Sequence, residues 1–302
     1  MKLDLGCGAA KTEGALGADL VALPGVDVVV DLRQRPYPFA TGAFTAIHLN
    51  DVIEHIPDTV RTMEELWRLL RPDGRVHIRV VNWNSHYTAM DPTHLHAYTE
   101  ESFDFFGKRS NRSYYSRARF DVVRVERRFS DVARHFCPSE RLLYFFSRFL
   151  SNVLEDLTFE LRAVKPASEP GEPQPGDWRG LLRCPYALAR GQGGALRRNG
   201  DWLISDESGH RYPVRGGVPV MTIEEGARWA AGAECDLPPP GALDPLPPPE
   251  DPLSSQTVAV PTIAPITTPV ELVKELVATY VPMAGRVVAD AVRRRLGRSP
   301  RT

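Results

Sequence analysis

Cysteine is scarce in this sequence. The chain has 302 residues and only 4 cysteines, which stand far apart at Cys7, Cys137, Cys184 and Cys235. No two of them have the short spacing of a zinc site, and a disulfide scaffold uses more of them. We therefore expect a reducing compartment, and the cytoplasm is the plain expectation.

Long apolar runs and a charge of one sign are also missing. No run of about 18 apolar residues predicts a transmembrane helix. The N-terminus has neither the apolar stretch nor the small-residue cleavage site of a signal peptide. The 37 Lys and Arg residues nearly balance the 38 Asp and Glu residues, which argues against a protein that binds polyanions over its whole surface.

Proline, in contrast, is abundant, with 27 residues that gather late in the chain. Residues 166–178 have the composition of a linker, and residues 230–268 have that of a disordered segment. A small second module is expected between them, at residues 179–229. Residues 269–297 regain the periodicity of an amphipathic helix, which Pro282 kinks or splits.

The first 165 residues alternate strand-like runs with helical patterns, which predicts a mostly parallel, doubly wound α/β sheet. Thr59–Leu70 has one apolar face and predicts a helix, and Ser139–Leu154 predicts another. The last two strands are expected to form an antiparallel edge. The expected strands are Lys2–Leu5, Leu16–Leu20, Val26–Val30, Ala46–Leu49, Arg75–Val81, Phe120–Phe129 and Leu157–Lys165.

A pair of glycines follows the first expected strand, in Asp4-Leu5-Gly6-Cys7-Gly8. Glycine lets the backbone turn sharply and approach a ligand closely, and nucleotide-like ligands bind at the carboxyl edge of a doubly wound sheet. A dinucleotide site would need a third glycine, but Ala9, Ala10 and Lys11 follow instead. The acid before the glycines suits a cationic ligand better than a pyrophosphate.

Two more acids end the next two strands. Asp19 ends the second strand, where it can accept hydrogen bonds from both hydroxyls of a ribose. Asp31 ends the third strand and can reach an adenine amino group, with Leu32 donating a backbone N–H to the ring. Each acid alone is weak evidence, whereas three acids at successive strand ends after Gly-x-Gly are much more specific.

With these motifs, residues 1–165 resemble the class I S-adenosylmethionine (SAM)-dependent methyltransferases. The resemblance covers LDLGCG, GADL, the run from DVVVDL to DVIEHI, and LWRLLRPDGRVHIRVVN. It implies a Rossmann-like seven-stranded sheet followed by a small, mainly-β module, with SAM as the cofactor. The segment after the glycines is too short for a full helix, so we expect a thin lid. The cofactor residues that the resemblance implies are Asp4, Gly6, Gly8, Asp19, Asp31, Leu32 and Asn50.

The acceptor side of such an enzyme is expected after the fourth and fifth strands. Asp91-Pro92-Thr93-His94 stands there, and a D-P-T-H-x-x-x-[YF]-T segment recurs in a subset of these methyltransferases. His94 is the expected substrate contact or base, and Asp91, His55 and His96 are secondary candidates. The alternative is structural, since Asp91 and Thr93 can cap a helix or shape the loop, and His55 can be structural or adjacent to the cofactor.

A metal site made of His86, His94 and His96 is a weaker hypothesis. No carboxylate or cysteine at a suitable spacing completes it. The sequence therefore predicts no metal.

Residues 108–134 are rich in Arg, with Tyr114 and Tyr115 interleaved. This pattern is compatible with nucleic-acid binding, since Arg contacts phosphates and Tyr stacks on bases. Strand residues alternate, however, so Arg124 and Arg128 can equally form a solvated face. Nucleic acid is therefore kept as a partner that the sequence does not favour.

Residues 179–229 resemble the small Trm112-like zinc-ribbon family through Leu181–Pro185 and Tyr212–Met221. Only one of the usual zinc ligands remains, so no structural zinc is expected. Trm112-like proteins activate methyltransferases, and the resemblance implies a docking or partner-binding role. The C-terminal helix is a second candidate for a protein partner. The four zinc-ligand positions are held by Cys184, Ala187, Ser205 and Ser208.

Three functions stay open. The favoured one is a SAM-dependent methyltransferase that transfers the sulfonium methyl to an O or N atom of a small-molecule or glycan-like acceptor. It would act mainly by alignment, with base assistance from His94. The alternatives are an RNA or protein methyltransferase, using residues 108–134 and the Trm112-like module, and a non-catalytic scaffold of the same fold. The acceptor itself is not predicted.

Overall fold

A computed structural model describes residues 1–107, 114–165 and 178–230. Nearly all of the expected linker and of the Pro-rich segment lies outside these residues. The expected C-terminal helix at 269–297 lies wholly outside them.

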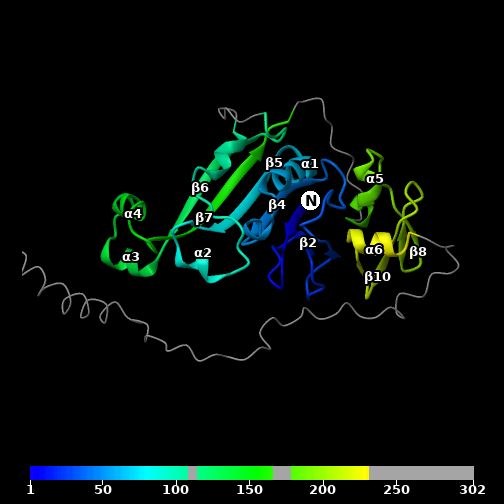
Figure 1. The fold of residues 1–302 in the computed structure, drawn as a ribbon, viewed down its shortest axis with the longest axis horizontal. Helices are drawn as coiled ribbons and strands as arrows, with labels where there is room; N and C mark the ends of the chain where they lie inside the picture. The colour runs from blue at the N-terminus through cyan, green and yellow to red at the C-terminus, as the bar shows by residue number, and fades with distance from the viewer. Residues whose placement is uncertain (108–113, 166–177, 231–302) are drawn as a thin grey trace, which may run out of the picture.

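A seven-stranded sheet forms the first part of the molecule (Figure 1). Its strand order is β3-β2-β1-β4-β5-β7-β6, and β1 to β5 pair in parallel. This order confirms the expected Rossmann-like α/β fold. The strands are β1 (Lys2–Leu5), β2 (Ala15–Asp19), β3 (Val28–Val29), β4 (Phe44–Asn50), β5 (Leu70–Val81), β6 (Phe120–Phe129) and β7 (Leu154–Ala163).

The last two strands form the expected antiparallel edge. β7 runs antiparallel to both β5 and β6, so β6 at the edge is parallel to the first five strands. The chain reaches the edge strand β6 first, and β7 then pairs between β5 and β6. The residue pattern of the sequence predicts where the strands lie, but not their order in the sheet.

The helix α1 (Thr59–Leu69) follows directly from the local sequence. The Asp58 carboxylate accepts the backbone N–H of Arg61 at 2.9 Å and caps the first turn. Its apolar face is buried at Met63, Leu66 and Leu69. The helix therefore packs as the 3.6-residue period predicts.

The expected helix at Ser139–Leu154 is shorter in the structure. It is α4 (Glu140–Ser147), and the chain turns through Asn152, at φ 62°, before β7 begins. The shorter helices of this part are the 3-10 helices η1 (Ile53–His55) and η2 (Ser102–Phe106), with α2 (His86–Met90) and α3 (Asp131–Phe136).

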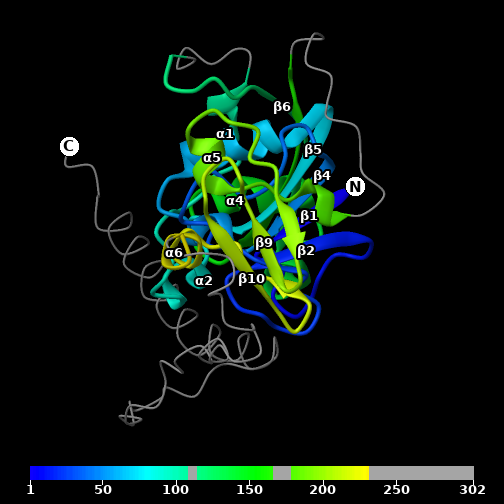
Figure 2. The same ribbon diagram turned by 90° about the vertical axis from the view of Figure 1, so that its right-hand side faces the viewer.

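A second, four-stranded antiparallel sheet follows in the order β11-β10-β9-β8 (Figure 2). Its apolar core includes Trp202, Tyr212 and Val220, whereas Val218 is only partly buried. The elements are η3 (Trp178–Leu181), α5 (Pro185–Ala189), β8 (Arg197–Asn199), β9 (Trp202–Ile204), β10 (Arg211–Arg215), β11 (Val218–Pro219) and α6 (Ile223–Arg228).

The second sheet is joined to the edge strand β3 of the first. Val29 and Val220 form a parallel bridge, and the Met221 N–H donates to the Val29 carbonyl at 2.9 Å. A second bridge links Phe39 and Leu182. These contacts cover an edge whose backbone groups would otherwise be open to pairing with another chain.

None of the helices in the described part of the chain has both the length and the apolar character needed to cross a membrane.

Candidate functional site

The glycine turn after β1 brings bare backbone to the carboxyl edge of the sheet. Gly6 has φ 68°, and a Cβ built there would lie 2.5 Å from Cγ2 of Val52, so a side chain does not fit. Gly8 has φ 52° and faces open space, with no atom within 4 Å of such a Cβ. Gly6 therefore serves close packing, whereas Gly8 leaves room for a ligand.

Asp4 is buried beneath this turn, with 1% of its surface exposed. Its Oδ2 accepts the Thr12 N–H at 2.6 Å, and its Oδ1 has no hydrogen-bond partner among the described residues. An unpaired buried carboxylate oxygen is costly. The position suits a ligand that brings a donor or a positive charge.

Asp19 at the end of β2 holds the glycine turn. Its Oδ2 accepts the Gly8 N–H at 2.9 Å, and its Oδ1 accepts the Val21 N–H at 3.1 Å. Each carboxylate oxygen can accept about two hydrogen bonds. Both oxygens thus retain capacity for the two hydroxyls of a ribose.

Asp31 is hydrogen-bonded to the two residues that follow Leu32. Its Oδ1 accepts from the backbone N–H and Nε of Arg33, and its Oδ2 accepts from Arg33 Nη2 and Gln34 Nε2. Burial opposes ionisation, yet the Arg33 hydrogen bonds and charge hold the pKa of Asp31 below its usual value. An adenine amino group would therefore compete with four donors. The Leu32 carbonyl next to it accepts the Tyr37 hydroxyl at 3.0 Å.

Asn50 ends β4 with an exposed side chain, at the same edge as the glycine turn because β4 pairs with β1 in parallel. Asp51 follows in the left-handed region, at φ 53°. Its carboxylate forms an ion pair with Arg79, and its N–H donates to the Arg79 carbonyl at 3.0 Å. Arg79 of β5 therefore holds the turn after β4 in place.

The D-P-T-H segment reaches back to the end of β4. Thr93 Oγ1 lies 2.9 Å from His55 Nδ1 and donates to Asp91 Oδ1 at 2.7 Å. The rings of His55 and His94 lie 4.7 Å apart, and His94 Nδ1 lies 3.0 Å from the Thr88 carbonyl oxygen. The structure therefore brings together three of the four predicted acceptor-side residues, His55, Asp91 and His94, although 39 positions separate the two histidines.

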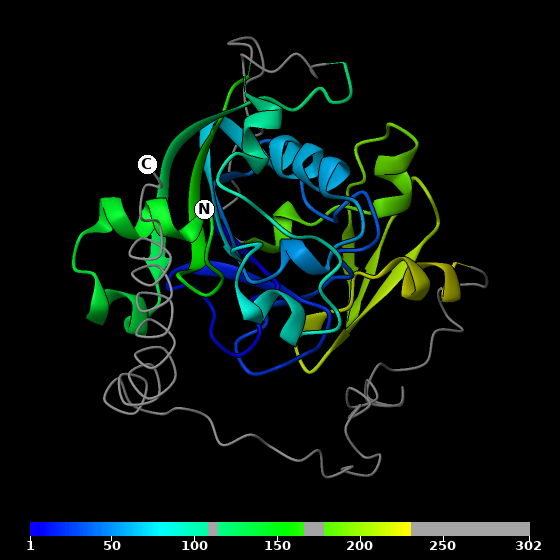
Figure 3. The ribbon, with the colours of Figure 1, turned by 60° about the vertical axis from the view of Figure 1, so that its left-hand side comes forward.

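The backbone after His94 ties this loop to η1. The Leu95 and His96 N–H groups donate to the Glu54 carbonyl at 2.8 and 3.3 Å. The Tyr98 hydroxyl lies 2.8 Å from Thr59 Oγ1 and donates to the Ile53 carbonyl at 3.3 Å. Figure 3 shows α2 and the loop after it in front of the sheet, close to η1.

The other histidines of the weaker metal hypothesis are not part of this cluster. His96 Nε2 lies 3.1 Å from the Pro57 carbonyl, and His86 Nδ1 lies 3.2 Å from Asn152 Oδ1. The set of His86, His94 and His96 is therefore not brought together. His96 becomes a loop anchor, which weakens it as a substrate contact.

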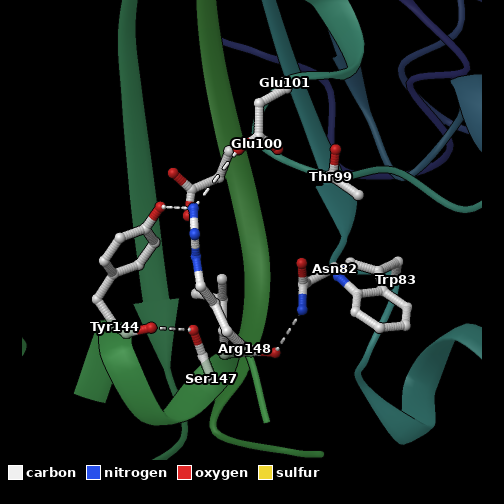
Figure 4. A pocket seen from close by; sticks show the side chains of 9 residues that line it. Asn82, Trp83, Thr99, Glu100, Glu101, Tyr144, Ser147 and Arg148 are labelled. Atoms are coloured by element: carbon white, nitrogen blue, oxygen red, sulfur yellow. Dashed lines mark hydrogen bonds and ion pairs between the residues drawn. The ribbon is translucent and has the colours of Figure 1, made fainter. Parts of the chain in front are cut away.

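A cavity of about 280 Å³ opens beside the segment that follows β5 (Figure 4). Asn82, Trp83 and Thr99 line one wall, and Tyr144 of α4 and Arg148 directly after α4 line the other. The cavity mixes aromatic, amide and charged groups, which is the lining expected for a small polar ligand.

Glu54 is a buried acid at this site that the sequence motifs did not identify. Its side chain is 2% exposed, and both carboxylate oxygens lack a hydrogen-bond partner among the described residues. Burial is the largest influence on the pKa of Glu54 and raises it, and the nearby Asp51 carboxylate also raises it, while His55 and His94 act in the opposite direction. The only signal was its place directly before His55, since its neighbours come from a distant loop.

The family of the chain follows from a direct match. A family model described as methyltransferase domain matches residues 2–164, which is more than half of the chain. The chain belongs to this methyltransferase family. It is a SAM-dependent methyltransferase, and SAM is its cofactor. No curated protein matches it.

Several solved structures resemble this methyltransferase. The YcgJ protein from Bacillus subtilis is 13% identical with a TM-score of 0.36, and the match covers 55% of this chain and 92% of that one. A putative methyltransferase from Bacillus halodurans C-125 is 13% identical with a TM-score of 0.38, over 54% and 92%. A complex of the Trm112 methyltransferase activator and a putative methyltransferase from Haloferax volcanii gives 14% and 0.36, over 54% and 82%. The family itself rests on the match to residues 2–164.

The residues at the carboxyl edge fit the cofactor of this methyltransferase. The unpaired Oδ1 of Asp4 can receive a donor, and the open space over Gly8 has the room that a side chain would fill. SAM supplies an activated methyl group on a sulfonium sulfur. The chain supplies the acidic and glycine surface that holds it.

The Arg-rich segment of the methyltransferase is largely neutralised where it is described. Arg124 pairs with Glu126, Arg127 with Glu100, and Arg128 with Glu155 and Asp156. Arg109 and Arg112 lie outside the described residues. The paired side chains favour a solvated face over a surface for phosphates.

The second sheet of the methyltransferase keeps its single cysteine buried. Cys184 Sγ lies 3.1 Å from Ser208 Oγ and 3.2 Å from the Tyr212 hydroxyl, so two of the expected zinc-ligand positions do meet. Ala187 and Ser205, at the other two positions, are fully buried. Hydroxyl and apolar packing thus occupies the place that metal ligands would take.

Proposed function

We propose that this protein transfers the methyl group of SAM to an O or N atom of a small-molecule or glycan-like acceptor. The observation that carries the proposal is the hydrogen bond of the D-P-T-H loop to the end of β4. His55 contacts Thr93, and the Glu54 carbonyl holds the loop backbone. The acceptor-side residues therefore lie at the same edge of the sheet as the cofactor turn.

Alignment is the main task of the protein in this proposal, because holding two reactants in line removes much of the entropic barrier. Asp4, Gly6, Gly8 and Asp19 hold the cofactor, with Asp31, Leu32 and Asn50 as its further contacts. The acceptor attacks the sulfonium methyl carbon, and the broken S–C bond leaves its electron pair on sulfur. His94, through Nε2, takes the proton from the acceptor, with Asp91 and His55 as its neighbours.

We further propose that residues 179–229 are a Trm112-like module that has lost its zinc. The support is its isolated bridge to β3 and the contact of Cys184 with Ser208. In this proposal residues 1–165 are the catalytic domain, and 166–178 and 230–268 are linkers. The helix at 269–297 remains a candidate for a protein partner.

The experiment measures SAM binding and turnover separately. Calorimetry on the full-length protein should show SAM binding that Asp19→Ala weakens. Release of S-adenosylhomocysteine is then followed with sugar, phenol and amine acceptors. His94→Ala should lose turnover while keeping its SAM affinity, and His86→Ala is the matched control that should keep both. No SAM binding in the wild type would favour a non-catalytic scaffold.

A second candidate, methylation of RNA or protein, has one supporting observation. The second sheet joins the catalytic sheet at β3, as an activating module would. Salt-dependent RNA binding that Arg124→Ala and Arg128→Ala abolish would support it. The ion pairs of these two arginines argue for the small-molecule acceptor instead.

A further inference from the structure

The histidines of the D-P-T-H loop and of η1 have fixed tautomers. The Thr93 hydroxyl donates to Asp91 Oδ1, because an ionised carboxylate can only accept. Its lone pair therefore accepts from His55 Nδ1 at 2.9 Å, so this nitrogen carries the proton. His94 Nδ1 faces the Thr88 carbonyl at 3.0 Å and must also donate. Both histidines thus keep the lone pair of Nε2 for another partner.

The two imidazoles lie next to a carboxylate. One possible ligand atom from each of His55, Asp91 and His94 lies within 4.8 Å of the other two. A point within about 2.8 Å of three such atoms therefore exists, and metal–nitrogen bonds are about 2.1 Å long. Shifts of under about 1 Å would close the site. Asp91 Oδ1 is used by Thr93, which leaves Oδ2 for the shared point.

The neighbouring Glu54 gives an independent sign of a missing positive charge. Its carboxyl group is almost fully buried, and neither oxygen has a partner among the described residues. This carboxyl group stands directly before His55 in the chain. A cation bound at His55 would compensate a buried carboxylate that has no other partner.

We propose that His55, Asp91 and His94 bind a divalent transition-metal cation, with Glu54 beside it. Two imidazoles and one carboxylate suit Zn²⁺, Fe²⁺ or Mn²⁺ better than Ca²⁺, which takes oxygen ligands. The contacts of Thr93 and Thr88 orient the rings in the way that outer hydrogen bonds do in metal sites. This proposal departs from the sequence-based expectation of no metal, because its ligand set comes from two segments of the chain.

The site also refines the proposed function, on which this step rests. A cation bound by His94 Nε2 would replace that nitrogen as the base, because the lone pair is then shared with the metal. It would instead draw in an oxygen acceptor and make its hydroxyl more acidic. The acceptor class narrows to hydroxyl compounds with a second oxygen that can chelate the cation.

The test uses the full-length protein, stripped of metal with a chelator and titrated with Co²⁺. Visible absorption bands should appear and saturate near one equivalent of Co²⁺. His55→Ala, Asp91→Ala and His94→Ala should each weaken Co²⁺ binding by at least about tenfold, and Thr93→Val should weaken it less. His86→Ala is the matched control in the same segment that should bind as the wild type does.

Thermal melting of each metal-free variant distinguishes a lost ligand from a lost fold. A variant that melts as the wild type does but no longer binds Co²⁺ supports the site. The absence of Co²⁺ bands in the wild type, or equal binding by all three ligand variants, would overturn it. SAM calorimetry on the same metal-free protein separates the two proposals. If SAM does not bind, the proposed methyl-transfer site is contradicted. The Co²⁺ titration still decides the metal site by itself.

Discussion

The Asp19 carboxylate accepts the backbone N–H of Gly8 at 2.9 Å, across the gap between β2 and β1. One residue therefore shapes the glycine turn and also stands where a ribose would bind. Function and local structure are joined in this side chain, so its removal should affect both.

Asp19→Ala should weaken SAM binding by at least about tenfold, equivalent to about 1.4 kcal/mol. The variant loses both the ribose acceptors and the contact that orders Gly8. Asp19→Asn keeps one acceptor oxygen and should lose less. Calorimetry measures both variants, and equal affinity of Asp19→Ala and the wild type would contradict the cofactor assignment.

Gly6→Ala and Gly8→Ala should fail in different ways. Both positions have positive φ, which costs an L-residue about 1–2 kcal/mol. Gly6→Ala also places a Cβ against Val52, which adds an overpacking cost of about 1–3 kcal/mol. Urea denaturation should therefore rank Gly6→Ala as less stable. Gly8→Ala should instead lose mainly SAM affinity, and the reverse ranking would contradict the packing described here.

His48 and His77 should make the fold sensitive to acid. They are cross-strand partners on β4 and β5, and their rings stack at 4.8 Å. Burial lowers the pKa of both below the usual 6.5. The unfolded chain therefore takes up protons first, and stability is lost as the pH falls from about 6.5 towards the folded pKa.

The double variant His48→Phe/His77→Phe checks this. Phenylalanine keeps a ring at each position but cannot titrate, so the fall in the urea midpoint between about pH 7.5 and 5.5 should shrink. If the urea midpoint of the variant fell as much as that of the wild type, other groups would be responsible for the acid sensitivity.

Cys184→Ala should destabilise the second sheet by about 1–3 kcal/mol, because it leaves a small cavity and removes a partner of the buried Tyr212 hydroxyl. Cys137→Ala, at a partly exposed position, is the matched control and should stay within about 0.5 kcal/mol of the wild type. Denaturation followed by tryptophan fluorescence measures both. If Cys184→Ala left the free energy of unfolding unchanged, the contacts of the thiol with Ser208 and Tyr212 would not contribute to stability.

The sequence predicted those parts of the fold and site that depend on local pattern. The strand after Met1, the turn at Gly6 and the acid at Asp19 are read from neighbouring residues, because period and residue type act over a few positions. The meeting of His55 with His94 depends on a loop folding back over β4. The partners of Asp31 and the burial of Glu54 also depend on packing, so no sequence motif predicts them.

The backbone hydrogen bond from Met221 to Val29 affects how the protein behaves on dilution. Both halves of that contact belong to one chain, so each finds the other at a local concentration that linker length sets, of millimolar order for short flexible linkers. A separate subunit bound at this edge would dissociate as its concentration falls. Here the stoichiometry is fixed at synthesis, and under the proposed Trm112-like role specific activity should stay constant from micromolar to nanomolar protein.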